Sequence, residues 1–304
     1  MKQASFETLN SCPVCSETVF SSFLTTTDHS ISKEAFTIVQ CASCGFKFTN
    51  PRPNTDEIGP YYESEDYISH SNTSKGVINR VYQLVRTYTI RKKTQLYARL
   101  AGNQVKSVLD YGCGTGELLK ELKKQGWTTL GIEPGEKARA FATAENGLHV
   151  KKPDALSEIA DKSFSIISMW HVLEHVHELH PTLKELKRIL NDNGRCIVAV
   201  PNSDSYDATL YGAHWAAYDL PRHLYHFNKA SVSKLFSMHK MEIEMILPMY
   251  FDSFYVSMLS EKYSTGKINY LSALINGIKS NAAGKKDNSN FSSLIFVLRK
   301  RELN

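Results

Sequence analysis

Hydrophobic residues recur along the middle of the chain in two spacings, which predict alternating strands and helices. Short apolar runs predict buried strands at 105–111, 127–132, 164–169 and 191–202. Apolar residues three and four positions apart predict amphipathic helices at 117–126, 183–190 and 229–236. Strands that alternate with helices in this way are typical of an α/β fold with a parallel sheet.

The two ends of the chain follow other patterns. Residues 77–100 combine an apolar face with a basic face and predict a helix, whose basic side is either a solvated surface or a surface for phosphate-bearing substrates. Two more strands are predicted at 241–247 and 292–299. A helical insertion at about 252–280 and a polar loop at 279–290 are expected between them.

A proline-rich segment at 50–60 marks a domain boundary, because three prolines and a glycine in so short a stretch interrupt regular structure. The chain of 304 residues is long enough for about two domains. We therefore divide it into an N-terminal module at 1–50, a linker and helical arm at 51–104, and a large domain at 105–304.

Composition and charge narrow the class of protein. Apolar residues make up 42% of the chain and charged residues 22%, which excludes fibrous and wholly disordered proteins. No run approaches the roughly 18 apolar residues of a membrane span, so we expect no membrane insertion. The first residues lack the apolar region of a secretory signal, so we expect a cytoplasmic protein. A net charge of +5 does not require a nucleic-acid partner, and none is expected.

Two Cys-x-x-Cys pairs, separated by 25 residues, have the spacing of a four-thiolate zinc site. The segment between them is rich in Thr, Val, Phe and Ser and suits a β-hairpin, which is the layout of a zinc ribbon. Paired disulfides would require a secreted protein, and a thioredoxin-like motif would require a single pair. We expect a structural zinc ion, and we interpret His29 as a loop residue. The predicted ligands are Cys12, Cys15, Cys41 and Cys44.

A glycine-rich loop follows the first predicted strand of the large domain and precedes a helix. Its glycines, Gly112, Gly114 and Gly116, would let a ligand approach the backbone closely. Glu133 ends the next strand, 21 residues after the first glycine, where a carboxylate can bind ribose hydroxyls. The spacing G-x-G-x-G followed by Glu117 disfavours a pyrophosphate, so a cofactor with an amino-acid end fits better than a dinucleotide.

The string D110-Y-G-C-G-T-G116 resembles motif I of the class I S-adenosylmethionine-dependent methyltransferases, and the resemblance extends from about residue 105 to 202. It implies a Rossmann-like sheet of seven strands in the order 3-2-1-4-5-7-6, with the last strand antiparallel. It also implies that the glycines hold the methionine part of S-adenosylmethionine, that Glu133 binds the ribose, and that Asp110 supports the loop and the cofactor's amino group. The adenine amine would meet Asp154 or Ala155.

The segment W170-H-V-L-E-H175 resembles small-molecule methyltransferases of this family. The resemblance places Trp170 and His171 beside the cofactor. His171, Glu174 and His175 share helical spacing and are candidate catalytic groups, whereas Glu174 and His175 can equally cap and buttress a helix. Ubiquinone-type O-methyltransferases place metal-binding acids in this segment. Because the first position here is a histidine, the use of a catalytic Mg²⁺ stays open.

A second polar and aromatic stretch, from His214 to Phe227, is similar to a string found in zinc-ribbon-bearing methyltransferases that resemble sugar C-methyltransferases and surface-polysaccharide enzymes. Asp219 and Arg222 could pair to order the loop, and this pairing is compatible with a functional role of the loop. We expect two aromatic residues to form a pocket wall, an arginine to bind an anionic group, and one of two histidines to act as base. These residues are, in turn, Trp215, Tyr218, Arg222, His223 and His226.

Together these patterns predict an enzyme that transfers a methyl group from S-adenosylmethionine to a small-molecule acceptor, such as a sugar or surface-polysaccharide precursor, with a histidine removing the acceptor's proton. Two alternatives remain. One is an RNA or protein methyltransferase that uses the zinc ribbon for recognition, although no N-P-P-Y string follows the fourth strand of the large domain. The other is a non-catalytic binding module with the same fold.

Overall fold

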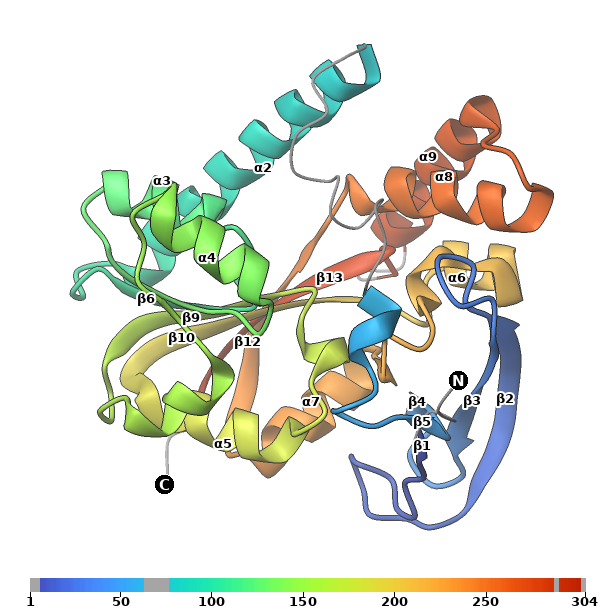
Figure 1. Ribbon diagram of the computed structural model, residues 1–304, viewed down its shortest axis with the longest axis horizontal. Coiled ribbons are helices and arrows are strands. Elements are labelled where there is room, and N and C mark those ends of the chain that lie inside the picture. Colours follow the sequence, from blue (N-terminus) through green and yellow to red (C-terminus); the bar gives the residue numbers. More distant parts are fainter. Residues whose placement is uncertain (1–5, 63–76, 287–289, 302–304) are drawn as a thin grey trace.

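A computed structural model describes residues 6–62, 77–286 and 290–301, apart from the side chains of 77–82. A central sheet carries helices on both faces, and the N-terminal module lies beside it (Figure 1). Residues 63–76, which belong to the predicted linker and helical arm at 51–104, lie outside the described residues.

The central sheet has seven strands in the order β12-β13-β10-β9-β6-β7-β8, which confirms the predicted topology. Strands β6 to β10 run parallel where they pair, and β13 is antiparallel to both of its neighbours. The strands are β6 (Ser107–Tyr111), β7 (Thr128–Ile132), β8 (Val150–Lys151), β9 (Phe164–Trp170), β10 (Leu190–Pro201), β12 (Met241–Pro248) and β13 (Ser293–Lys300).

Helices cover the two faces of this sheet and bury a separate core on each side. Leu96 and Leu119 belong to the core under α2 and α3, whereas Leu186 and Leu235 belong to the core under α5 and α7. Burial of these leucines out of water is the main favourable contribution to folding. The helices are α2 (Val77–Ala101), α3 (Glu117–Lys124), α4 (Glu136–Ala144), α5 (Leu179–Ile189) and α7 (Lys229–Met238).

The N-terminal module is a small antiparallel structure that the large domain completes. Its main sheet has the order β11-β4-β3-β2, and β11 comes from the large domain, with Tyr225 opposite Phe48. Phe46 and Phe48 are buried in the core that also contains α5 and α7. The predicted boundary at residue 50 therefore crosses a shared sheet and a shared core. The strands are β1 (Phe6–Glu7), β2 (Phe20–Thr27), β3 (Ala35–Cys41), β4 (Lys47–Thr49), β5 (Arg52–Pro53) and β11 (Tyr225–His226).

Two helices form a hairpin between β12 and β13: α8 (Asp252–Thr265) and α9 (Tyr270–Lys286). The predicted polar loop at 279–290 is wrong, because α9 continues to Lys286. Small residues explain the longer helix: Ser280 donates to Asp207 at 2.8 Å, and Gly284 lies against the ring of Phe291. Among the described residues, no helix is long and apolar enough to span a membrane.

Short helices occupy the loops that follow the sheet's strands. They are η1 (Gly59–Tyr62), η2 (Pro153–Glu158), η3 (Leu173–His175), α6 (Tyr206–Tyr211), η4 (Gly212–His214) and η5 (Ala216–Tyr218).

Candidate active site

The glycine loop after β6 takes a backbone that side chains tolerate poorly. Gly112, Gly114 and Gly116 have φ of 77°, 55° and 80°. A Cβ atom at Gly112 would lie 2.3 Å from Val172, and one at Gly116 would lie 2.3 Å from Leu148. At Gly114 no atom would lie within 4 Å among the described residues. Two glycines therefore allow tight packing, and the third leaves an open surface that a ligand can approach.

Glu133, at the end of β7, organises this loop. Its Oε2 accepts a hydrogen bond from the backbone N–H of Gly114 at 2.8 Å, and its Oε1 accepts one from Gly135 at 2.8 Å. Each carboxylate oxygen retains further acceptor capacity for hydroxyl donors. The carboxylate can therefore accept further hydrogen bonds beside the open glycine surface, and ribose binding stays a prediction.

Asp110 and Lys93 bring opposite charges close to the loop. Asp110 is buried and accepts a hydrogen bond from Ser168 at 2.5 Å. Burial raises the pKa of Asp110 to about 6, against the opposing effects of Ser168 and Lys93. Lys93 of α2 lies over the ring of Trp170, 3.7 Å from its centroid, and burial lowers its pKa to about 8.

These groups fit the zwitterionic end of S-adenosylmethionine, since a carboxylate and an ammonium lie near an open backbone. Trp170 is further fixed by Tyr97, whose hydroxyl accepts its indole N–H at 2.8 Å. Sequence patterns did not assign Lys93 and Tyr97 to the site, because the packing of α2 against Trp170 at the end of β9 has no local signal. Asp154 is exposed in η2 and Ala155 is buried, and their contact with adenine stays a prediction.

His171 follows β9 and lies between two carboxylates. Its Nε2 is 3.0 Å from Oδ2 of Asp252, and its Nδ1 is 3.5 Å from Oε1 of Glu174. Burial lowers the pKa of His171, but Asp252 and Glu174 more than compensate and raise it to about 10. At neutral pH the ring is therefore protonated and has no free nitrogen lone pair with which to accept a proton.

A second cluster joins Glu174, His175 and His223, whose candidate ligand atoms all lie within 4.8 Å of one another. Nδ1 of His223 lies 2.8 Å from the carbonyl of Ala217, and Nδ1 of His175 lies 2.9 Å from the carbonyl of Arg222. Because a carbonyl can only accept, we assign the proton to Nδ1 in both rings. The basic nitrogen of each ring is then Nε2.

Glu174 gives this cluster its unusual electrostatics. The side chain is 0% exposed, and its Oε1 pairs with Nδ1 of His171 at 3.5 Å, a long contact for a buried carboxylate. Burial lowers the pKa of His175 to about 4, with His223 contributing, so His175 is neutral at pH 7. A buried carboxylate with so few close donors favours a further positive charge nearby. The cluster could hold a metal ion through nitrogen and oxygen ligands, or it could stabilise a protonated imidazole.

Two aromatic residues and a histidine of the predicted acceptor site lie away from the cavity. Trp215 and Tyr218 are buried in a core, and the indole N–H of Trp215 donates to Asp207 at 2.8 Å. Neither ring lines the cavity of about 690 Å³ that has His171 and His223 in its wall. His226 is buried on β11, with Nε2 3.1 Å from the hydroxyl of Thr49. His226 therefore faces the N-terminal module, whereas His223 lines the cavity.

Arg222 also lines the cavity, but carboxylates already satisfy its guanidinium. Its Nη2 donates to Asp28 at 3.0 Å and to Asp219 at 2.7 Å. The pairing of Asp219 with Arg222 that the sequence left open as an alternative is therefore present.

One cavity of about 690 Å³ connects several of these groups. His171 and His223 lie in its wall, together with residues of α8 and the loop at 29–33 of the N-terminal module. His29 stacks on Tyr263 of α8, with ring centroids 4.5 Å apart. The sequence suggested only a loop position for His29, because the approach of the N-terminal module to α8 has no local signal.

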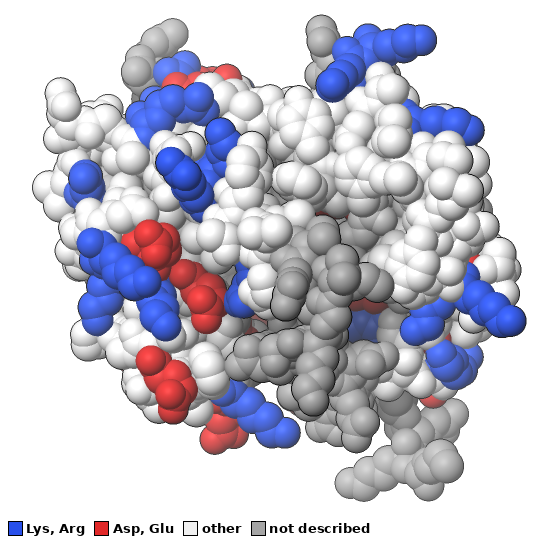
Figure 2. Space-filling model, turned by 90° about the horizontal axis from the view of Figure 1, so that it is seen from above, with Lys and Arg blue, Asp and Glu red and all other residues white. Residues whose placement is uncertain are grey.

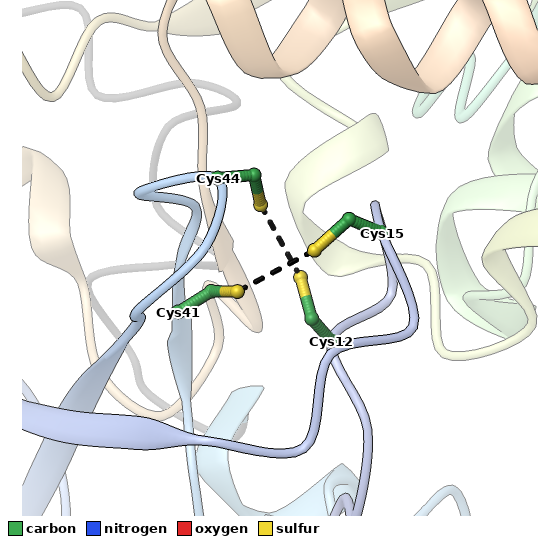
Figure 3. Close-up of side chains that lie close together, drawn as sticks. All are labelled: Cys12, Cys15, Cys41 and Cys44. Carbon is green, nitrogen blue, oxygen red and sulfur yellow. Dashed lines mark hydrogen bonds between the residues drawn. The ribbon is translucent and has the colours of Figure 1, made fainter.

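The four predicted zinc ligands converge on one point (Figure 3). Sγ of Cys12 is 3.6 Å from Sγ of Cys44, and Sγ of Cys15 is 3.5 Å from Sγ of Cys41. All four are free cysteines. Tetrahedral zinc with Zn–S bonds of about 2.3 Å separates sulfurs by about 3.8 Å. The cluster therefore has the size that a four-thiolate zinc site requires.

Comparison with known proteins identifies the family. The family model described as "Methyltransferase domain" matches residues 85–240, about half of the chain. The chain belongs to the class I S-adenosylmethionine-dependent methyltransferases. The chain is 30% identical over 141 residues to the ubiquinone biosynthesis O-methyltransferase of Pseudomonas putida strain GB-1. The aligned region covers 43% of this chain and 60% of the relative. The same enzyme of Pseudomonas fluorescens strain SBW25 is 29% identical over 133 residues, or 41% of this chain and 57% of the relative.

The methyltransferase therefore spans only about 60% of the length of these curated relatives. A solved structure supports the fold: magnesium protoporphyrin IX methyltransferase of Synechocystis PCC 6803, with bound SAH, aligns with a TM-score of 0.54. It covers 81% of this chain and 100% of the other, at 13% identity.

Proposed function

We propose that the protein transfers a methyl group from S-adenosylmethionine to a small anionic acceptor held in the 690 Å³ cavity, and that His223 removes the acceptor's proton. The observation that carries this proposal is the path of the cavity. It reaches from His171, next to the end of β9 beside the glycine loop, to His223. Open parallel sheets bind ligands at this edge.

The cofactor end of the site is formed by Asp110, Lys93, Glu133 and the open face of Gly114. S-adenosylmethionine, when bound, supplies an electrophilic methyl group on a sulfonium. The residues of the chain hold the acceptor in line with that methyl group and exclude water, which lowers the barrier by positioning.

The acceptor end of the site favours an anionic molecule. Arg222 and His171 are already paired with carboxylates, whereas Lys33 and Lys262 lie at exposed positions in the cavity wall. An ammonium at each side of the opening would attract a phosphate or carboxylate. A sugar or polysaccharide precursor linked to a phosphate has this chemistry. The curated relatives are named O-methyltransferases, which supports an oxygen nucleophile on a small molecule.

Proton removal is assigned to His223 because its Nδ1 already donates to Ala217, which leaves Nε2 as the basic nitrogen. The buried carboxylate of Glu174 lies within 4.8 Å of the imidazole and would stabilise the imidazolium that forms. His171 is unsuitable because two carboxylates keep its pKa near 10.

The proposed zinc ion, held by the four thiolates, has a structural role, since four protein ligands leave no open position. Its effect on the reaction is indirect: the module it stabilises carries His29 and Lys33 into the cavity wall.

A matched pair of variants tests the function. Purified protein is screened with labelled S-adenosylmethionine against nucleotide sugars, phosphorylated sugars and phenols, and turnover on the best acceptor is followed across pH. His223→Asn should lower kcat by about 100- to 10,000-fold, the usual contribution of a general base, and should abolish its pH dependence. His226→Asn, three residues away but outside the cavity, should retain the pH profile. Equal loss in both variants would reject the base assignment, and labelling of no small acceptor would reject the acceptor class.

A further inference from the structure

The hairpin formed by α8 and α9 has an apolar outer face that the described residues leave uncovered. On the inner side of α9, small residues such as Ala273, Gly277 and Ser280 are buried. On the outer side, large apolar residues are between 43% and 68% exposed. We call these residues the hairpin face: Tyr270, Leu271, Leu274, Ile275 and Ile278.

More exposed aromatic residues extend this apolar surface toward the cavity. Tyr250, Phe251 and Tyr255 are 43–46% exposed at the beginning of α8, and Phe251 packs edge-on against Tyr88 of α2 at 5.9 Å. Tyr255 also lines the cavity. Large contiguous apolar patches are uncommon on monomeric proteins and mark interaction sites.

The fully exposed charged residues of the described hairpin are all lysines, and its two described acidic side chains are paired. Asp252 is paired with His171, and Glu261 is buried and accepts hydrogen bonds from Tyr211 and Ser272. Figure 2 looks down on this end of the molecule, and its right-hand lobe is largely white, with basic side chains at the edges and little acidic surface. The exposed charged residues of α8, α9 and the turn between them are Lys262, Lys267, Lys279, Lys285 and Lys286.

We propose that the hairpin face docks on the surface of an anionic lipid bilayer. An amphipathic helix with large apolar residues on one face and lysines beside them lies in the plane of such an interface, because apolar burial and attraction to acidic headgroups act together. A second copy of the chain is disfavoured, since pairing two such faces would bring lysines against lysines. The proposal goes beyond the proposed function and does not depend on it, because binding is measured without cofactor or acceptor.

Docking has a consequence for the acceptor, because Tyr255 and Lys262 belong to the hairpin and also line the cavity. A bilayer against the hairpin face would lie beside the cavity opening. An acceptor whose phosphate is linked to a lipid could then reach the cavity while its tail stays in the membrane.

Vesicle sedimentation of the full chain tests the docking. The probes are vesicles of phosphatidylcholine alone and vesicles that also contain phosphatidylglycerol. We expect binding to the anionic vesicles at least tenfold tighter than to the neutral ones, and weaker binding at high salt. The double variant Leu271→Glu, Leu274→Glu should lose most of this binding, and Lys267→Gln with Lys279→Gln should weaken it.

Val105→Glu is the matched control, since Val105 is 77% exposed but lies just before β6, away from the hairpin. It should bind as the unaltered protein does, and thermal melts should show that all variants are folded. Equal binding to both vesicle types, or equal loss in the hairpin and control variants, would overturn the proposal. Light scattering that shows a dimer abolished by the Leu271→Glu, Leu274→Glu variant would assign the face to a second copy and would also overturn it.

Discussion

Arg222 and Asp28 form a buried ion pair that joins the large domain to the N-terminal module. Nη2 of Arg222 donates to Oδ1 of Asp28 at 3.0 Å, and the two side chains are 3% and 0% exposed. Burial raises the pKa of Asp28, but hydrogen bonds from Arg222 and from the backbone of Ser32 lower it to about 2. Because Asp219 also pairs with Arg222, the arginine is held by carboxylates from both parts of the protein.

Removal of one partner should destabilise the fold strongly. Asp28→Asn leaves the buried guanidinium with one carboxylate, and we expect a loss of about 3–5 kcal/mol in the free energy of unfolding. Urea denaturation measures this. The pKa of Asp28 is depressed, so its stabilisation is present above about pH 4 and is lost as pH falls through about 2. Glu158→Gln, which breaks the exposed pair with Lys151, is the control and should leave the midpoint unchanged. If the two variants had the same urea midpoint, the Arg222–Asp28 pair would not have the structural role assigned to it.

Cofactor binding should depend on the open surface at Gly114. Gly114→Arg would fill that surface, and calorimetry should show at least a tenfold loss of affinity for S-adenosylhomocysteine. Gly102→Arg is a closely matched control, because Gly102 has the same φ of 55° and also has no atom within 4 Å of a built Cβ among the described residues. Both variants carry the same backbone strain, and Gly102 lies at the end of α2. Retained binding in Gly114→Arg would place the cofactor elsewhere.

The thiolate cluster should carry about one zinc ion per chain, measurable by elemental analysis of the purified protein. Cys41→Ser should lose the metal and lower the melting temperature, since zinc binding contributes directly to folding of such modules. Cys196→Ala also removes a buried thiol, but from β10, and should retain the zinc. Zinc retained after Cys41→Ser, or absent from the unaltered protein, would remove the ribbon assignment.

His171 should titrate far above an ordinary histidine. Burial opposes its charge, but Asp252 and Glu174 raise its pKa to about 10, so nuclear magnetic resonance should find it protonated at pH 8. Because the pKa of His171 is raised in the folded protein, its ion pairs stabilise the fold fully below about pH 6.5. This contribution to the free energy of unfolding is lost as pH rises through about 10. Asp252→Asn should lower the pKa of His171, whereas Asp161→Asn, at an exposed turn, should not. A pKa near 6.5 in the unaltered protein would restore His171 as a candidate base.

The sequence was sufficient for features whose cause is local. The glycine loop between β6 and α3 follows from a short apolar run, three glycines and an amphipathic pattern, and the resemblance carried by motif I implied the strand order that the sheet has. The four cysteines meet because each Cys-x-x-Cys turn presents two thiolates and the hairpin at 20–41 brings the turns together. The length of α9 in the helical hairpin could not be predicted from local sequence. This helix extends beyond its predicted end because its small inner residues pack on other elements.

The acceptor site needed the tertiary structure. His223 and His226 are three residues apart and cannot be distinguished by residue type. Pairing of β11 with β4 turns His226 toward Thr49 of the N-terminal module, while His223 remains in the cavity wall. Trp215 and Tyr218 were predicted to form a pocket wall; both are buried in a core and border only a small pocket of about 10 Å³.

The sequence by itself determined the glycine loop and the thiolate cluster, because each depends on residues linked by short stretches of chain, whereas the strand order was implied by the family resemblance. Only the tertiary structure decided which histidine faces the cavity, that Lys93 lies over Trp170 and that His29 lines the cavity. Those side chains come from separate elements. Their positions depend on how α2, α8 and the N-terminal module pack on the sheet, and packing between distant segments leaves no periodic signal in the sequence.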